Sequence, residues 1–461
     1  MSKVYSKDEM QELVELHKEH LWLHITNHSA FENQDPPIMV AGKGAMIQDI
    51  QGREYLDGLS GGVWCVNVGY GQEAIITAIT EQLRELPYYA GSMGNPPYIR
   101  LAKKLAELSP ATPRAYIANS GSEANEKTFK IARQYFKLKY PEKNKHKIIY
   151  RHRDYHGSSI AVLAATGQEE RKSGYGPFPA GFAEMPHALC YRCQFGKTYP
   201  SCNVECAHAL EKVIQSEGPD EVAAVILEPI TAGGGIIVPV PEYYPIIREI
   251  CDKYEVLLIM DEVVNGFGRT GKMFGYQNYD FEPDMITMAK GLASSYMPIS
   301  AALTKQFIFE QFKVDAADTL GYFRDISTFG GCAAGCAAAL ANIKIMEEEK
   351  LVANSAAMGD YLLESLKDLE ALPHVGEVRG KGLFLGIELV EDKKTKAPLP
   401  EKYLAQMVAE AKADGVMIGR MSRSVPQSNN VLTAAPPLII TKEETKRLAD
   451  TFRKVVTNFH K

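Results

Sequence analysis

Short, unbroken apolar runs recur along the middle of the chain and alternate with segments of helical periodicity. The runs lie at 115–119, 148–150, 222–227, 256–260 and 285–289. Apolar runs of this length, without polar alternation, are typical of strands buried on both faces of a parallel sheet. Strands that alternate with helices predict an α/β fold, in which helices cover both faces of a large, mostly parallel sheet.

The remaining pattern predicts a smaller α+β lobe built from both termini. Short strands joined by Gly-containing turns are expected at 39–41, 45–49, 54–57, 375–389, 416–419 and 431–434. Helices are expected at 8–23, 72–86, 97–109, about 120–139, 332–349, 353–371, 401–414 and from 441 onward. The predicted domain division is 1–65 for the N-terminal part of the small lobe, 66–330 for the large domain and 331–461 for the C-terminal small domain.

Composition narrows the class of protein. The chain has 461 residues, of which 45% are hydrophobic and 23% charged, and its formal net charge is -6. This net charge does not indicate the basic surface with which proteins bind nucleic acid. No apolar run approaches the roughly 18 residues of a membrane span. The polar N-terminal segment does not resemble a signal peptide, so a cytoplasmic location without a membrane partner is expected.

Two of the predicted strands end on groups of opposite charge. The run 256–260 ends on Asp261, and the run 285–289 ends on Lys290. In parallel sheets ligands bind beyond the carboxyl ends of the strands, so both groups are expected at one edge. Pyridoxal phosphate (PLP) needs such a pair, because a lysine binds it as a Schiff base and an acid keeps its ring nitrogen protonated. Strands also end in charged residues where the chain returns to water. These two residues alone therefore do not establish a PLP site, and other features of the sequence are needed.

Small residues occupy the turn between the strand at 115–119 and the next helix. Ser120, Gly121 and Ser122 would let backbone N–H groups surround an anion at the helix start. Ser120 and Glu123 also fit a capping box. The two readings are compatible, because a capped helix start can still bind phosphate.

Two aromatic residues are further candidates for a site. Tyr155 follows the strand at 148–150 and is followed by His156 and Gly157, so it could stack on a flat ring or simply form a turn. Trp64 lies in a Gly-rich apolar run at 61–71. A core position and a pocket wall are about equally consistent with this tryptophan.

Taken in chain order, these motifs resemble the class III aminotransferases of PLP fold type I. The motifs are SGSEAN, YHG, EP, DEVVNGFGRTG, AKG, TFGG and RGKGL, and the resemblance covers almost the whole chain. It implies pyridoxal 5'-phosphate as the cofactor. It also implies an obligate homodimer with shared active sites, with a tetramer left open.

The resemblance assigns roles to individual residues. It implies that Lys290 binds the cofactor as a Schiff base and later transfers protons, and that Asp261 pairs with the pyridine nitrogen. The other implied positions are Val263 and Tyr155 on the two ring faces, Gly121 and Ser122 at the phosphate, Glu228 near the ring oxygen or substrate, Thr328 at the phosphate of the neighbouring subunit, and Trp64 at the substrate entry.

Within this family, the run VWCVNVGYG is typical of omega-aminotransferases that use pyruvate as amino acceptor. The chain as a whole, including the segment KEHLWLHITNHS near the start, most resembles members of this family that use taurine as the amine donor. That resemblance implies sulfoacetaldehyde and alanine as products of a ping-pong mechanism. β-Alanine, other omega-amino acids and simple amines stay open as donors. A PLP aminomutase or decarboxylase on the same fold is a remoter alternative.

The acid group of such substrates requires a bidentate cation, normally arginine. Arg420 and Arg423, in the segment IGRMSRSVPQSNN, are the candidates, and Arg423 is slightly preferred. A solvated surface arginine is the alternative for each.

Four cysteines lie close together in the sequence: Cys190, Cys193, Cys202 and Cys206. Clustered thiols can bind zinc. However, the second pair has C-x3-C spacing and no histidine completes a zinc pattern, so a structural loop is favoured and no metal is assigned. A non-catalytic metal-binding scaffold is the alternative class for the whole chain, and Asp261 and Lys290 argue against it.

Overall fold

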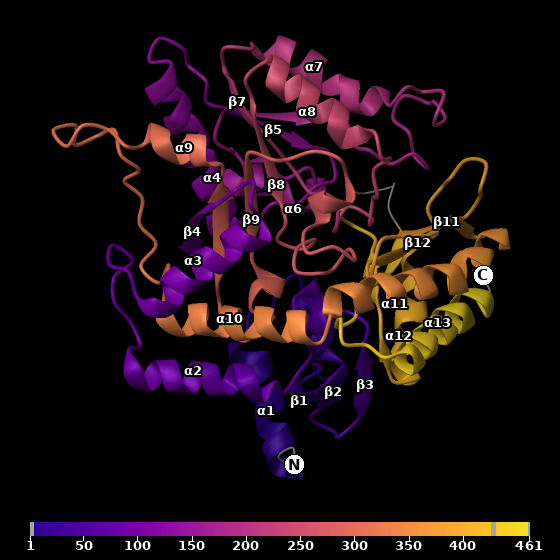
Figure 1. The fold of residues 1–461 in the computed structure, drawn as a ribbon. Coiled ribbons are helices and arrows are strands. Elements are labelled where there is room, and N and C mark those ends of the chain that lie inside the picture. Colours follow the sequence, from indigo (N-terminus) through magenta and orange to yellow (C-terminus); the bar gives the residue numbers. More distant parts are fainter. Residues whose placement is uncertain (1–3, 426–429, 460–461) are drawn as a thin grey trace.

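The computed structural model describes residues 4–425 and 430–459. Its centre is a seven-stranded sheet (Figure 1). In spatial order the strands are β4 (Arg114–Ala118), β10 (Ser300–Thr304), β9 (Met285–Met288), β8 (Leu257–Asp261), β7 (Val222–Leu227), β5 (Lys147–Arg151) and β6 (Phe182–Met185). Strands β9, β8, β7, β5 and β6 pair in parallel, whereas β10 is antiparallel to both β9 and β4. The carboxyl ends of β4, β8 and β9 therefore lie at one edge.

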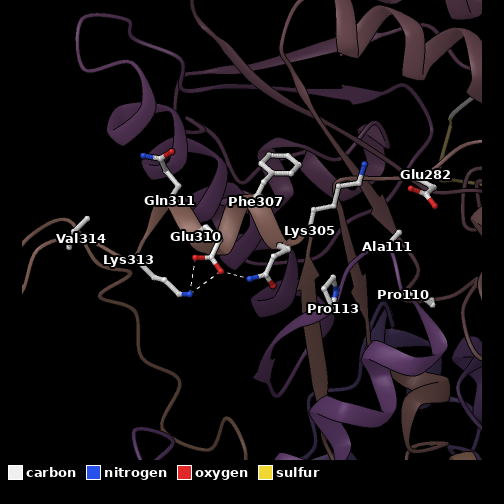
Figure 2. A pocket seen from close by; sticks show the side chains of 11 residues that line it. Pro110, Ala111, Pro113, Glu282, Lys305, Phe307, Glu310, Gln311, Lys313 and Val314 are labelled. Atoms are coloured by element: carbon white, nitrogen blue, oxygen red, sulfur yellow. Dashed lines mark hydrogen bonds and ion pairs between the residues drawn. The ribbon is translucent and has the colours of Figure 1, made fainter.

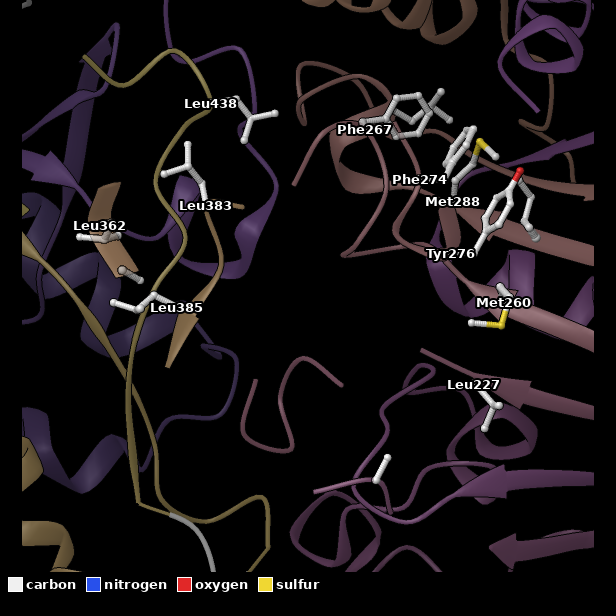
Figure 3. Close-up of a cluster of buried hydrophobic side chains, with 14 of the residues drawn as sticks. Leu227, Met260, Phe267, Phe274, Tyr276, Met288, Leu362, Leu383, Leu385 and Leu438 are labelled. Carbon is white, nitrogen blue, oxygen red and sulfur yellow. The ribbon is translucent and has the colours of Figure 1, made fainter. Parts of the chain in front are cut away.

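Alternate residues of the central strands are buried on opposite faces of the sheet, as the apolar runs predict. The covering helices are α4 (Gly121–Lys139), α7 (Glu205–Glu217) and α8 (Tyr243–Lys253). Ile226 and Ile259 pack in one cluster with Phe129 of α4. Leu227 and Met260 belong to the cluster on the other face, which includes residues of α7 and α8 (Figure 3). The predicted α/β fold class is confirmed.

Two strands of the central sheet were missed by the sequence pattern, which predicts only five. β6 is short and carries Glu184, so it lacks an unbroken apolar run. β10 reads SAALT, whose small residues give little hydrophobic signal although every position is buried. In both cases pairing with the neighbouring strands defines the strand, and the residues' own hydrophobicity does not signal it.

Two smaller sheets use strands from both ends of the chain. The N-terminal sheet consists of β1 (Met39–Lys43), β2 (Met46–Asp49), β3 (Glu54–Asp57) and β13 (Val416–Met417). The C-terminal sheet consists, in order, of β11 (Val375–Gly380), β12 (Leu385–Leu389), β15 (Val431–Ala434) and β14 (Gly419–Met421). The single strand predicted at 416–419 is wrong, because β13 pairs in parallel with β3 whereas β14 pairs with β15.

The remaining helices frame these sheets (Figure 1). They are α1 (Lys7–His20), α2 (Glu73–Glu85), α3 (Pro96–Leu108), α5 (Ile160–Ala164), α6 (Glu169–Lys172), α9 (Gln306–Gln311), α10 (Ala333–Glu348), α11 (Leu351–Leu366), α12 (Glu401–Ala413) and α13 (Lys442–Thr457). α10 packs against α2 and α3, and α13 packs against α11 and α12. The domain boundaries at 65 and 330 stay predictions. No helix in the described part of the chain is long and apolar enough to cross a membrane.

Candidate active site at the edge of the central sheet

Lys290 and Asp261 emerge at the same edge of the central sheet, as their positions after parallel strands predict. Lys290 follows β9 with φ 40, a left-handed conformation that is uncommon for a residue with a side chain. Burial lowers the pKa of its amine, while Cys65, Asp261 and Glu228 act in the opposite direction. No carboxylate of the described residues lies within ion-pair distance of its Nζ. The site thus contains an amine that is partly withdrawn from water and is not tied to an acid.

Asp261 is the last residue of β8 and is held by side chains from other elements. Its Oδ2 lies 2.8 Å from His156 Nδ1 and accepts a hydrogen bond from Asn125 Nδ2 at 2.8 Å. Its Oδ1 accepts the Val263 N–H at 3.0 Å. Thr287 Oγ1 donates to Asn125 Oδ1 at 2.6 Å, which orients the amide. The carboxylate is only 3% exposed and has a fixed orientation.

The start of α4 forms a cradle of backbone groups beside these residues. Ser120 caps the helix by accepting the Glu123 N–H at 3.2 Å. The predicted reciprocal half of the capping box is absent, because the Glu123 carboxylate accepts the Asn119 N–H instead. A Cβ atom on Gly121 would lie 3.0 Å from Val263 Cγ1. Ser122 Oγ accepts the Ser158 N–H at 3.0 Å, so the cradle joins two loops. Such a helix start suits a phosphate group.

Glu228 and Tyr155 lie next to each other beside this pair. The Glu228 carboxyl group accepts the N–H of Tyr155 at 2.9 Å and that of Ala232 at 3.1 Å. Burial, together with the carboxylates of Asp154 and Asp261, raises the pKa of Glu228 well above its usual value. The two backbone N–H donors act on this pKa in the opposite direction.

Trp64 lies near Lys290. Its ring is 5.9 Å from Lys290 Nζ and 5.5 Å from the ring of Phe384, in an edge-on arrangement. The indole Nε1 is buried and has no hydrogen-bond partner among the described residues. Trp64 is thus a wall of the space around the lysine rather than an isolated core residue.

Three predicted residues lie apart from this group. Arg420 and Arg423 both form ion pairs with Glu401, at 3.2 and 2.9 Å. Neither guanidinium contacts Lys290 or Asp261. Thr328 is exposed, and its carbonyl oxygen accepts a hydrogen bond from Tyr88 Oη at 2.8 Å.

Some residues of the site were not predicted from the sequence. Asn125 and His156 belong to the motifs SGSEAN and YHG, but no local pattern shows that both reach Asp261. Arg171 of α6 lies with its guanidinium carbon 5.8 Å from the centre of the Tyr155 ring. Its Nε is buried without a hydrogen-bond partner in the described parts of the chain. Arg171 therefore presents an unused donor beside the site.

A depression of about 920 Å³ lies away from the candidate site (Figure 2). Its lining includes Lys305 and Phe307 and, on the other side, Pro113. Lys305 follows β10, whose last residue pairs with Arg114 at the start of β4. This depression is therefore at the edge of the sheet away from Asp261 and is not part of the candidate site.

The clustered cysteines share one small cavity. Cys190, Cys193, Cys202 and Cys206 all line it, and all are free thiols. Burial raises the pKa of the Cys206 thiol to about 11, and the neighbouring cysteines add to that effect. In residues 4–425 and 430–459, no group of three or more His, Cys, Asp or Glu side chains is arranged to hold a metal ion. The loop instead contacts the C-terminal sheet, where Arg192 pairs with Glu388 of β12. Lys396 Nζ, from the segment after β12, also donates to the Tyr191 carbonyl at 2.5 Å.

Comparison with known proteins agrees with this geometry. The sequence profile of the family described as Aminotransferase class-III matches residues 30–456. The taurine–pyruvate aminotransferase of Bilophila wadsworthia (strain 3_1_6) is 54% identical over 447 residues, which are 97% of each chain. The hypotaurine/taurine–pyruvate aminotransferase of Paracoccus denitrificans (strain Pd 1222) is 48% identical over 451 residues, 98% of each chain. The crystal structure of a Bacillus anthracis aminotransferase is 42% identical with a TM-score of 0.94, over 99% of this chain and 100% of that one.

Proposed function

The chain belongs to the class III aminotransferases, and on that premise we propose that it transfers the amine of taurine to pyruvate, giving sulfoacetaldehyde and alanine. The enzyme is a PLP-dependent aminotransferase. The observation that carries the choice of substrates is the similarity, over nearly the whole of both chains, to relatives that bear taurine–pyruvate names.

The residues at the sheet edge fit the cofactor. Lys290 would carry it covalently, and Asp261 would face its ring nitrogen. Asn125, His156 and the Val263 N–H hold that carboxylate in a buried position. Gly121 and Ser122 would hold the phosphate at the start of α4, where the glycine leaves room that a Cβ would fill. The ring would lie between Val263 and Tyr155, with Glu228 near its oxygen or the substrate.

The chemistry divides between cofactor and protein. When bound, PLP accepts the amine and delocalises the electron pair left on the substrate carbon. The lowered pKa of Lys290 leaves a larger share of its Nζ unprotonated at neutral pH than in a surface lysine. Nζ would take the proton from the amine-bearing carbon of the donor and deliver it to the cofactor carbon that gains the amine. In the second half of the reaction it would move a proton in the opposite direction, onto the carbon of pyruvate that receives the amine. Asp261 would keep the ring nitrogen protonated throughout.

The acid groups of taurine and pyruvate need a cation near the site. Arg171 is suitably placed beside Tyr155 and has an unused buried donor. Arg423 and Arg420, the candidates from the sequence, would each have to leave Glu401 before binding an acid group. We therefore prefer Arg171 for the sulfonate or carboxylate, with Arg423 as the second candidate.

A half-reaction screen tests the substrate assignment. The holoenzyme is mixed separately with taurine, β-alanine, 4-aminobutyrate, putrescine and 1-phenylethylamine, without an acceptor, and the visible absorbance of the lysine-bound cofactor is followed. Fast loss of that band with taurine and its return on adding pyruvate support the proposal. Loss of the band with amines that lack an acid group, while taurine is inert, contradicts it.

We also propose that the enzyme works as a homodimer in which Thr328 reaches the partner's phosphate site. Large apolar side chains are exposed around this residue, among them Tyr89, Met93, Ile326 and Phe329. Exposed apolar side chains gathered in this way suit a protein interface. Analytical ultracentrifugation is expected to give the mass of a dimer or a higher even-numbered assembly, and a monomer that retains full activity contradicts the shared site.

A further inference from the structure

A buried network of charged side chains joins the C-terminal sheet to a turn next to the candidate active site. Arg379 of β11 donates through Nη1 to Glu377 at 2.7 Å and to Glu388 at 2.5 Å. Arg192, from the cysteine-containing loop, also pairs with Glu388. Glu388 is fully buried and Arg379 is 8% exposed. Charges buried to this extent are tolerated only with partners, so this network fixes the place of the Arg379 guanidinium.

The rest of that guanidinium holds a turn of the large domain. Arg379 Nε donates to the carbonyl oxygens of Gly235 and Ile236 at 2.9 and 3.0 Å, and Nη2 donates to that of Gly235 at 2.6 Å. Ile236 has φ 51, a left-handed conformation that a β-branched residue rarely adopts. Such a conformation persists only where the surroundings hold it. The three hydrogen bonds from Arg379 hold the backbone at Gly235 and Ile236.

The same turn contacts two walls of the active site. Ala232, three residues before Gly235, donates its N–H to the Glu228 carboxyl group at 3.1 Å. The Ile236 side chain is fully buried in a cluster that includes Phe384 and the partly buried Trp64. Trp64 in turn faces Lys290 Nζ at 5.9 Å. A displacement of the turn would therefore reach both Glu228 and Trp64.

We propose that Arg379 is a positioning residue for amine transfer: by holding Gly235 and Ile236, it sets the position of the Trp64 ring opposite Lys290. This inference rests on the proposed roles of Lys290 and Trp64 and is independent of which amine is the donor. It differs from a purely structural role, in which Arg379 would contribute only to the stability of the contact between the C-terminal sheet and the large domain.

The first test uses the enzyme without its cofactor. The chain has only two tryptophans, and Trp22 is 91% exposed, so a Trp22→Phe background leaves Trp64 as the single reporter. Arg379→Lys keeps a positive charge beside Glu388 but cannot bind both carbonyl groups of the turn. We expect its Trp64 emission to shift to longer wavelength. An emission unchanged from the background protein overturns the proposal.

A matched control is Arg248→Lys. Arg248 is also a largely buried arginine, and it pairs with Asp284 at 2.7 Å and with Asp252 at 2.7 Å. Asp284 precedes β9, at the end of that strand away from Lys290. We expect a loss of thermal stability without a shift in Trp64 emission. An equal emission shift in this control would mean that destabilisation alone moves Trp64, and would overturn the proposal.

The second test measures the half-reaction of the holoenzyme with whichever amine the wild type accepts fastest. We expect Arg379→Lys to lower its rate constant about tenfold, a transition-state effect that Arg248→Lys lacks. Residues that act through one another are non-additive, so adding Arg379→Lys to Trp64→Phe should lower the rate little further. Full additivity overturns the proposal. Failure of taurine as donor leaves this test and the emission test unaffected.

Ile236→Gly keeps the test decisive if Arg379→Lys does not fold. Glycine adopts the left-handed conformation without strain, and all the ion pairs of Arg379 remain. This variant removes the Ile236 side chain from the cluster against which Trp64 packs. We expect the same direction of emission shift, and an unchanged emission overturns the proposal.

Discussion

His156 Nδ1 lies 2.8 Å from Asp261 Oδ2, and both side chains are buried, at 2% and 3% exposed. The His156 carbonyl oxygen also accepts a hydrogen bond from Asn125, which bonds the same carboxylate oxygen. Nε2 of His156 has no hydrogen-bond partner in the described parts of the protein. The imidazole and the Asn125 amide therefore hold the same oxygen of the Asp261 carboxylate.

We expect His156→Leu to impair catalysis without preventing folding. Loss of a hydrogen bond to a charged group costs about 1.5–3 kcal/mol, which corresponds to a roughly 10- to 100-fold lower kcat. Steady-state kinetics and cofactor retention on dialysis measure the effect. His152→Leu is the control, because the His152 ring interacts with Glu184 and His187 instead of with Asp261. Equal rates in the two variants would show that the contact with Asp261 is dispensable.

Gly121→Ala tests the cradle at the start of α4. The new Cβ would lie 3.0 Å from Val263 Cγ1, so either Val263 or the helix start has to shift. We expect the Kd for PLP to rise about tenfold, in line with the loss of roughly one good hydrogen bond to the phosphate. Titration of the apoenzyme with PLP measures it. Gly335→Ala, where the nearest atom is at 3.5 Å, should leave the Kd unchanged.

Glu262 gives a pH dependence of stability. Its carboxyl group is fully buried and accepts the N–H groups of Gly275 and Tyr276, and burial raises its pKa to about 8. The folded protein thus binds a proton more tightly at this group than the unfolded chain does. The contribution of Glu262 to the free energy of unfolding is therefore fully present below pH 4.5 and is lost as the pH rises to about 8.

The measurement is the Tm of wild type and Glu262→Gln at several pH values. The variant is expected to be less stable at low pH, because an amide accepts only one of the two N–H groups well. The difference between the two proteins should shrink as the pH rises through about 8. A difference that is constant across this range would mean that Glu262 does not titrate there.

The placement of Asp261 and Lys290 at one edge of the sheet could be predicted because the signal is local. Asp261 and Lys290 each follow an unbroken apolar run, and the parallel direction of β8 and β9 brings their ends together. The neighbours of Asp261 could not be predicted in the same way. Asn125 and His156 are 136 and 105 positions away from it in the sequence, so only the folded chain shows the contacts.

Non-local pairing also explains the errors in the fold. β13 has two residues and is held by parallel pairing with β3, which comes from the other end of the chain. No periodicity within Val416 and Met417 could separate them from β14. Arg171 was missed for a related reason: its α6 helix has four residues, and only the folded chain brings its guanidinium carbon to 5.8 Å from the centre of the Tyr155 ring.

Lys290→Ala should remove the visible absorbance of the bound cofactor and all measurable turnover, because both require the amine. In the wild type, the rate of the half-reaction should rise with pH as Nζ loses its proton. Because burial lowers the pKa of Lys290, this rise should occur below 10.5, the ordinary value for lysine. A profile that rises only near that value, or turnover in the alanine variant, contradicts the assigned role.

Arg171→Met tests which cation holds the acid group. Methionine keeps much of the apolar stem but removes the guanidinium beside Tyr155. An ion pair with a partly buried guanidinium contributes about 1.5–3 kcal/mol, so the KM for both taurine and pyruvate should rise roughly 10- to 100-fold. Arg420→Met and Arg423→Met are matched variants, whose guanidinium groups are paired with Glu401. If Arg423→Met raises both KM values and Arg171→Met does not, Arg423 leaves Glu401 on substrate binding and the sequence-based choice is right. If only Arg171→Met raises them, the acid group lies against Tyr155, and an amine without an acid group should react equally well in the wild type and in Arg171→Met.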